Sequence, residues 1–167
     1  MPAPSSAPSR LLFVLTALVL LAMLGWYWRE SRPVELPSSP LADPRMQCVS
    51  YAPYYRDGYT PFKEDLRLTR EEIATDLRAL AAVTRCVRTY SVDQGLDQVP
   101  EVARELGLTV LLGAWIGRDD EKNRRELERA LDVANANTDV VTMLIVGNEV
   151  LLRREQSPEA MGRWLEE

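Results

Sequence analysis

Apolar strand-like runs alternate with helical patterns four times between residues 46 and 167, and this alternation limits the possible folds more than any other feature of the chain. Each run is short, and the stretch that separates it from the next is long enough for a helix. Strands that alternate with helices form a parallel sheet covered by helices. Two α/β architectures remain open, a doubly wound sheet and a (β/α) barrel. The runs expected as strands are 48–51, 86–90, 109–115 and 140–146.

The helices between these runs are marked by their first and last residues. Thr69 and Glu72 have the spacing of a capping box, which predicts the start of the first helix. A second helix is expected to begin around Pro100 and to end at Gly107, and a longer one is expected over 120–136. The inward-facing residues expected on this longer helix are Leu127, Ala130, Leu131 and Ala134, and a fourth helix that opens at 157–158 carries Met161, Trp164 and Leu165.

The fourth run ends on a carboxylate. Its apolar residues, 140–146, predict a strand that is buried on both faces, and Gly147, Asn148 and Glu149 follow directly. A carboxylate buried at such a place is costly unless it is hydrogen-bonded or protonated. Glu149 is therefore either an acid with a tuned pKa or simply a hydrophilic residue that opens a loop.

One observation argues against a dinucleotide-binding sheet. The segment after the first strand, 52–58, contains no G-x-G-x-x-G pattern. A complete (β/α)8 TIM barrel needs eight strand-helix units and typically about 250 residues. The chain has four such units, so we expect the first half of a barrel, over residues 46–167, as a fragment of a longer catalytic domain.

The amino-terminal region predicts a membrane anchor and a spacer. Residues 1–10 have the composition of a disordered leader, and residues 11–28 form an uncharged stretch as long as the hydrocarbon core of a bilayer. A cleavable signal peptide is the alternative, but no A-x-A site follows. Residues 29–45 contain four prolines and predict an extended linker. Arginines flank both ends of the apolar stretch, so the positive-inside rule does not fix its orientation.

The composition excludes several classes of site. The chain has no histidine and two cysteines, which excludes Ser-His-Asp and Cys-His catalysis as well as histidine or cysteine-rich metal sites. A net charge of -5, without a basic block, argues against nucleic-acid binding. Carboxylates are therefore the expected catalytic groups, and no metal or organic cofactor is implied. Cys48 and Cys86 lie on adjacent predicted strands, either as a disulfide or as buried thiols.

Polar and aromatic residues stand at the carboxyl end of every predicted strand, which is where the active site of a (β/α) barrel lies. Together they offer a proton donor, an amide, a guanidinium and aromatic faces that suit a sugar. Each one taken alone has a structural interpretation, as an ion-pair or core residue. Four aspartates that follow strands, Asp57, Asp93, Asp119 and Asp120, are interpreted as structural. The candidate site residues are Tyr51, Arg88, Tyr90, Trp115, Asn148 and Glu149.

Four short motifs resemble glycoside hydrolase family 17. They are Tyr-Ala-Pro at 51–53, Val-Arg-Thr-Tyr at 87–90, Leu-Leu-Gly-Ala-Trp at 111–115 and Val-Gly-Asn-Glu-Val at 146–150. More narrowly, they resemble membrane-attached bacterial members of the family that act on β-1,3-glucan. The resemblance covers about residues 46–167. Its Asn-Glu pair is shared by the wider clan of retaining barrel glycosidases and is therefore less specific for the family.

The resemblance implies a role for each candidate residue. Glu149 would be the general acid/base, and Asn148 would contact the sugar 2-hydroxyl. Arg88 would support the nucleophile, while Tyr51, Tyr90 and Trp115 would line glucose subsites. The family's nucleophile is a glutamate on the seventh strand, which lies beyond residue 167. We therefore expect residues 1–167 alone to cleave no glucan.

The function implied is hydrolysis or transglycosylation of β-1,3-glucan through a glycosyl-enzyme intermediate. The implied location is the cell inner membrane, with the catalytic domain on the periplasmic or extracellular side and a fused or associated membrane glycosyltransferase as a further partner. Two alternatives belong to other classes. One is a non-catalytic glucan-binding or scaffold module of a membrane-bound glucan synthesis system, and the other is an unrelated α/β domain in which Asn148 and Glu149 merely end a strand.

Overall fold

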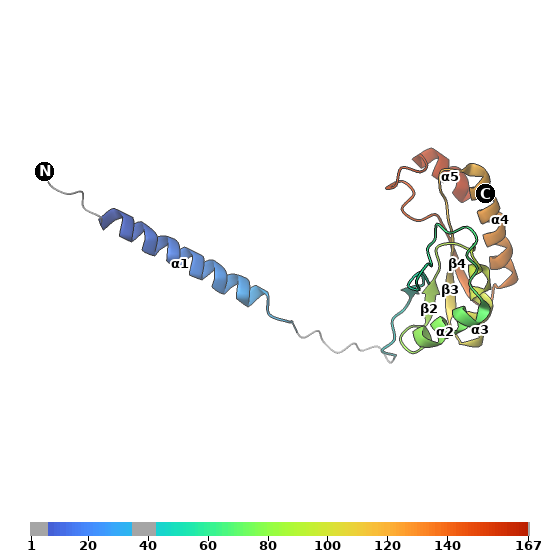
Figure 1. Cartoon of the computed structure of the whole chain (residues 1–167), viewed down its shortest axis with the longest axis horizontal. Helices are drawn as coiled ribbons and strands as arrows, with labels where there is room; N and C mark the ends of the chain where they lie inside the picture. The colour runs from blue at the N-terminus through green and yellow to red at the C-terminus, as the bar shows by residue number, and fades with distance from the viewer. Residues whose placement is uncertain (1–6, 35–42, 167) are drawn as a thin grey trace. The chain divides into compact units, whose positions relative to one another are not determined.

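The computed structural model describes residues 7–34 and 43–166 and divides the chain into two compact units, 1–40 and 41–167 (Figure 1). In the described part of the first unit, residues 7–34, there is one helix, α1 (Ala7–Glu30). Its stretch Arg10–Glu30 is long and apolar enough to cross a membrane, a property that a signal sequence shares. The helix takes in residues 7–10 of the expected leader, while residues 1–6 of the leader and residues 35–42 of the expected linker lie outside the described residues.

The second unit has the expected order of strands and helices. Its sheet contains β1 (Val49–Ser50), β2 (Cys86–Arg88), β3 (Thr109–Ala114) and β4 (Val141–Val146), all parallel and in sequence order. The helices are α2 (Arg70–Ala81), α3 (Val99–Glu105), α4 (Asp120–Ala136) and α5 (Pro158–Glu166), with a 3-10 turn, η1 (Leu96–Gln98), before α3. Sequence order without crossing is the arrangement of consecutive barrel strands. The α/β class and the four strand-helix units are confirmed.

The core lies between the sheet and the helices. Val87, Val110 and Leu112 are fully buried on the face of the sheet that the helices cover, and Ile73 and Leu77 of α2 are fully buried against them. Figure 1 shows α4 alongside β3 and β4. Because strand side chains alternate between faces, Arg88 and Leu111 point to the other side of the sheet, where a complete barrel has its interior.

The helix boundaries follow the local signals in the sequence. Thr69 and Glu72 form both bonds of the capping box, and Gly107 adopts a positive φ of 67° just after α3. The Asp119 side chain caps α4 by accepting hydrogen bonds from the backbone N–H groups of residues 121 and 122. The start and end of α4 match the predicted range, 120–136. These ends were predictable because each depends on residues only a few positions apart.

Two expectations about burial are wrong. We expected the fourth strand to be buried on both faces, but Met143 is 57% exposed because β4 is the edge strand of the described sheet. Leu131 of α4 was expected to face inward, but it is 37% exposed. On α5, Trp164 is the buried residue, whereas Leu165 is 64% exposed. Periodicity places a residue on a stripe, but the width of the buried stripe depends on which elements pack against it.

Cys48 and Cys86 form a disulfide. Val49 pairs with Val87 in the parallel register, so Cys48 and Cys86, which directly precede these two residues, lie side by side. The Cα atoms are 4.3 Å apart. The choice between a disulfide and buried thiols, which the sequence leaves open, is decided in favour of the disulfide.

Replacing Gly113 with Ala is expected to lower the free energy of unfolding by about 1–3 kcal/mol through overpacking. A Cβ at this position would overlap the Thr89 carbonyl oxygen and lie 2.7 Å from the Tyr90 Cα, and neither backbone atom can move alone. The matched control is Gly162→Ala in α5, where a Cβ would meet nothing within 4 Å. Thermal unfolding followed by circular dichroism compares the two, and equal melting temperatures would contradict the overpacking argument.

Candidate active site at the carboxyl end of the sheet

The candidate site begins with a contact between the ends of β2 and β4. One guanidinium nitrogen of Arg88, Nη2, donates a hydrogen bond of 3.0 Å to Oδ1 of Asn148, 60 positions away in sequence. The same guanidinium lies 4.7 Å from the centroid of the Tyr90 ring. The Tyr90 hydroxyl donates a 2.9 Å hydrogen bond to the Ser50 hydroxyl, which joins the end of β1 to the group. Three of the sequence-predicted positions, Arg88, Tyr90 and Asn148, thus meet at one edge of the sheet, and Glu149 directly follows Asn148 in the sequence.

Arg88 keeps one donor without a partner. Its Nε is buried and has no hydrogen-bond partner among the described residues. Buried nitrogen donors are nearly always satisfied in folded proteins, so an unsatisfied one calls for an explanation. The arrangement leaves a position beside Arg88 that suits an acceptor.

Glu149 follows a tight change of backbone direction. Gly147 has φ of 77° and Glu149 itself has φ of 53°, both in the left-handed region. The Glu149 side chain is exposed and borders a cavity of about 300 Å³ that apolar residues of this loop and Met161 line. The Glu149 carboxyl is therefore not buried in the described structure, in which β4 is the edge strand of the sheet.

Arg153 is a site residue that the sequence analysis missed. It lies four positions after Glu149, its guanidinium is 4.3 Å from the centroid of the Trp115 ring, and its Nη1 donates to the Asn148 carbonyl oxygen. Glu155 Oε2 accepts two further bonds from it, of 2.9 and 2.7 Å. Arg153 therefore connects the loop after β4 to Trp115 at the end of β3. Its only signal in the sequence is its closeness to Glu149.

Glu126 of α4 was also missed. Its Oε1 accepts hydrogen bonds from the backbone N–H of Val92, at 3.0 Å, and of Trp115, at 3.1 Å. Burial raises the pKa of the Glu126 carboxyl, although hydrogen bonds from Ser91 and from the two backbone groups oppose this. The sequence signal that could have identified Glu126 is its position among the inward-facing residues of α4, next to Leu127 and on the same side as Ala130.

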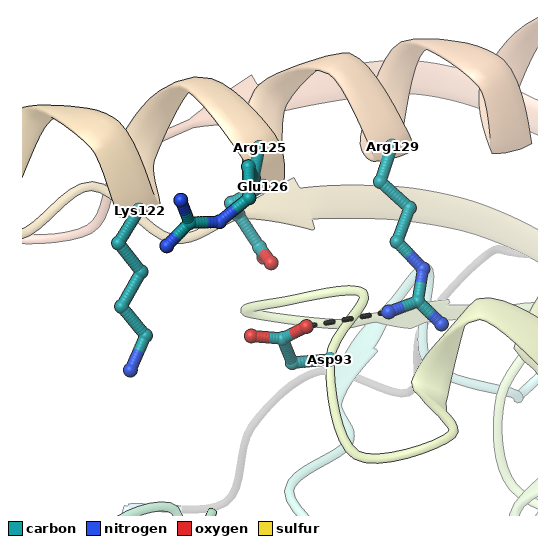
Figure 2. Close-up of a pocket in the computed structure, with 5 residues that line it drawn as sticks. All are labelled: Asp93, Lys122, Arg125, Glu126 and Arg129. Carbon is teal, nitrogen blue, oxygen red and sulfur yellow. Dashed lines mark hydrogen bonds and ion pairs between the residues drawn. The ribbon is translucent and has the colours of Figure 1, made fainter.

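Figure 2 shows Glu126 at the side of a cavity of about 290 Å³ between α4 and the loop after β2. Lys122, Arg125 and Arg129 also line this cavity, and Arg129 pairs with Asp93 at 3.4 Å. Among the described residues, no group of three or more histidine, cysteine, aspartate or glutamate side chains is placed to hold a metal ion, here or elsewhere.

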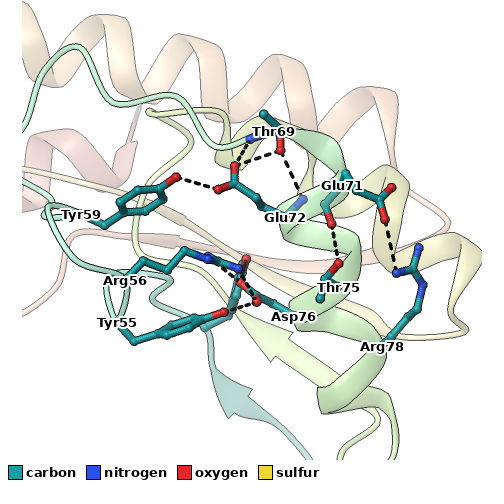
Figure 3. A network of polar contacts seen from close by, with 10 residues as sticks. Tyr55, Arg56, Tyr59, Thr69, Glu71, Glu72, Thr75, Asp76 and Arg78 are labelled. Carbon is teal, nitrogen blue, oxygen red and sulfur yellow. Dashed lines mark hydrogen bonds and ion pairs between the residues drawn. The ribbon is translucent and has the colours of Figure 1, made fainter.

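Tyr51 lies apart from the other candidates. It is 4% exposed, and its hydroxyl donates a 2.9 Å hydrogen bond to Asp76 of α2, on the helix-covered side of the sheet. Figure 3 shows that Tyr55 and Arg56 converge on the same carboxylate. Burial, reinforced by the Asp76 charge, raises the pKa of the Tyr51 hydroxyl. The structure does not bring Tyr51 together with Arg88 and Asn148, because adjacent residues of a strand point to opposite faces.

The aspartates interpreted as structural have structural contacts in three cases. Asp119 caps α4, Asp93 pairs with Arg129, and Asp120 accepts a 3.0 Å hydrogen bond from Gln156. Asp57 is exposed in the loop after β1.

Lowering the pH is expected to weaken the N-terminal cap of α2, because it protonates the Glu72 carboxylate. Hydrogen bonds from the Tyr59 hydroxyl and from Thr69 lower the pKa of Glu72 from 4.5 to about 2 (Figure 3). A lowered pKa stabilises the folded state above pH 4.5, and this contribution is lost as the pH falls from there toward 2. The melting temperature of a Glu72→Gln variant should therefore change less over this range than that of the parent protein. Glu71→Gln, an exposed neighbour in the same helix turn, is the control, and identical pH profiles for Glu72→Gln and the parent would contradict the prediction.

Comparison with known proteins identifies the family to which this chain belongs. The family model of the BtgE/BtgC glycoside hydrolase domain matches residues 48–166. The chain is 31% identical over 108 residues to the probable beta-glucosidase btgE of Aspergillus flavus and to that of Aspergillus oryzae. That alignment covers 62% of this chain and 16% of each relative.

Two solved structures share the fold. The crystal structure of the glycoside hydrolase family 17 beta-1,3-glucanosyltransferase from Rhizomucor miehei matches with a TM-score of 0.57 and 28% identity. An active-site mutant of that enzyme in complex with laminaritriose matches with a TM-score of 0.56 and 27% identity. Each match covers 71% of this chain and 42% of the other. The chain thus spans less than half of the solved enzyme and resembles part of its barrel. Because the family model matches most of its length, the chain belongs to the BtgE/BtgC glycoside hydrolase domain family.

Proposed function

We propose that the full-length protein is a retaining glycosidase or transglycosylase that acts on β-1,3-glucan, with Glu149 as its general acid/base. In the first step the Glu149 carboxyl donates its proton to the glycosidic oxygen while a second carboxylate attacks the anomeric carbon and the leaving sugar departs. In the second step water or a sugar hydroxyl attacks the glycosyl-enzyme, gives its proton to Glu149 and releases the nucleophile. Transfer to water is hydrolysis and transfer to a sugar is transglycosylation.

The observation that carries the proposal is the Arg88–Asn148 hydrogen bond beside Glu149. Three strand ends supply Tyr90, Trp115 and this pair to one edge, which is the active-site edge of a barrel. Asn148 offers an amide for a sugar hydroxyl, and Trp115, which is 37% exposed, offers an aromatic surface. An active-site mutant of the Rhizomucor miehei enzyme was solved in complex with laminaritriose, which supports a glucan oligosaccharide as the ligand.

The unsatisfied Nε of Arg88 supports a second carboxylate at this site. A retaining glycosidase needs its two carboxyl groups about 5–5.5 Å apart. A nucleophile from a later strand, beyond residue 167, would give the buried Nε of Arg88 its acceptor. Residues 1–167 alone are accordingly expected to be inactive.

Incubation of the full-length protein with defined laminari-oligosaccharides tests this function. Products longer than the substrate, detected by mass spectrometry, indicate transglycosylation, and only shorter products indicate hydrolysis. Retention of the β-configuration, followed by proton NMR, is expected in both cases. Binding without any product would instead favour the non-catalytic glucan-binding module, and inverted products would rule out the retaining mechanism.

We further propose that α1 anchors the protein with the second unit on the oxidising side of the membrane. The helix has the length and composition of a membrane span, and a disulfide such as Cys48–Cys86 persists in the periplasm or outside the cell but rarely in the cytoplasm. Labelling of intact cells with a membrane-impermeant reagent tests the orientation, and labelling that requires cell lysis would reverse it. A fused or associated glycosyltransferase stays part of this proposal for the membrane complex.

A further inference from the structure

Glu126 is a buried carboxylate that holds two separate loops with one oxygen. Val92 lies after β2 and Trp115 lies directly after β3, and both donate their backbone N–H to Glu126 Oε1. Tyr90 is two positions before Val92. One side chain of α4 thus ties together the two segments that carry the candidate aromatic residues.

A second residue of the same helix supports the Trp115 loop. Asn123 is one helix turn before Glu126, and its side chain accepts a 2.7 Å bond from the Gly117 N–H and donates a 3.0 Å bond to the Gly117 carbonyl. Residues three apart on a helix lie on the same face, so Asn123 and Glu126 reach the same loop together. Arg153 covers the Trp115 ring from the loop after β4. Both the backbone and the ring of Trp115 are therefore held.

Stability alone does not explain a carboxylate at position 126. Glu126 is 6% exposed and its Oε2 is buried without a partner among the described residues, which is costly. Leu127 and Ala130 show that the neighbouring inward positions of α4 pack apolar side chains. A carboxyl that is costly to bury is explained by its hydrogen bonds to the backbone N–H groups of Val92 and Trp115, which it holds in place.

We propose that Glu126 is a positioning residue that sets the Trp115 platform, and the adjoining Tyr90 segment, to receive a glucose ring of the glucan. This inference rests on the proposed function, because it takes Trp115 as a sugar-stacking surface. Glu126 itself touches no substrate; it acts through the backbone of Trp115.

A double-mutant cycle on glucan binding tests the proposal. Binding of laminaripentaose is measured by calorimetry in the full-length protein carrying Glu149→Gln, so that the ligand is not turned over. Glu126→Ala is expected to weaken binding about fivefold, and Trp115→Ala at least as much. In the Trp115→Ala background, Glu126→Ala should cause no further loss. Glu126→Gln keeps an acceptor oxygen for both N–H groups and should restore binding to within about twofold of the parent.

The matched control is Asn137→Ala at the other end of α4. Asn137 is 7% exposed; its side chain donates a hydrogen bond to the Val133 carbonyl and accepts one from Arg104, at the end of α4 remote from Trp115. It should lower the melting temperature and leave the laminaripentaose affinity unchanged. Faster amide exchange at Trp115 and Val92 in Glu126→Ala, and not in Glu126→Gln, gives a second readout that does not depend on ligand.

The outcomes separate the inference from the proposed function. Additive losses from Glu126→Ala and Trp115→Ala, or an equal loss in Asn137→Ala, would overturn the positioning role. Unchanged affinity in Trp115→Ala would overturn it as well, while activity on laminari-oligosaccharides would still support the glycosidase. Absence of both binding and activity in the parent protein would instead overturn the proposed function itself.

Discussion

Replacing Glu149 with Gln in the full-length protein is expected to lower turnover of laminari-oligosaccharides by several orders of magnitude. The amide keeps the size of the side chain but has no proton to donate to the leaving oxygen and no base to activate the acceptor in the second step. Because the substrate contacts remain, binding should change much less than kcat. Initial rates measured over a range of laminaripentaose concentrations give both quantities.

A substrate with a good leaving group sharpens the test. An aryl glucoside whose phenolate leaves without protonation should regain much of the first step in Glu149→Gln, because only the proton donor is missing. Glu159→Gln, the same change at an exposed position of α5, is the control and should keep full activity. Full turnover of laminaripentaose by Glu149→Gln would show that Glu149 is not the general acid/base of this reaction.

Loss of the Cys48–Cys86 disulfide is expected to lower the free energy of unfolding by about 4 kcal/mol. The bond joins residues 38 positions apart, and closing a loop of that length restricts the unfolded chain by this amount in the chain-entropy model. It also fixes β1, which has only two residues, against β2. The Cys48→Ser/Cys86→Ser variant should therefore melt well below the parent protein under oxidising conditions.

The redox dependence provides the control for this experiment. The chain contains only these two cysteines, so a reductant should lower the melting temperature of the parent and leave that of the double serine variant unchanged. Equal melting temperatures of the parent under oxidising and reducing conditions would show that the bond contributes nothing to stability.

The short-range features of this protein could be predicted from its sequence. The ends of α2, α3 and α4 depend on capping residues within a few positions of each other, and the parallel strands follow from the repeated alternation of apolar runs with helices. The same logic placed Arg88, Tyr90, Trp115 and Asn148 at the carboxyl ends of strands, because a strand's end is marked locally.

The contacts between those residues, and the faces on which some of them lie, depend on the tertiary structure. Tyr51 was expected beside Arg88 but faces α2, since a shift of one residue along a strand moves a side chain to the opposite side of the sheet. Glu126 and Arg153 gave only weak signals, because their partners at Trp115 are 11 and 38 positions away in sequence. The pattern of residues along the chain determined which elements form and in what order, whereas packing between distant elements decided which side chains face the site and which hold it in place.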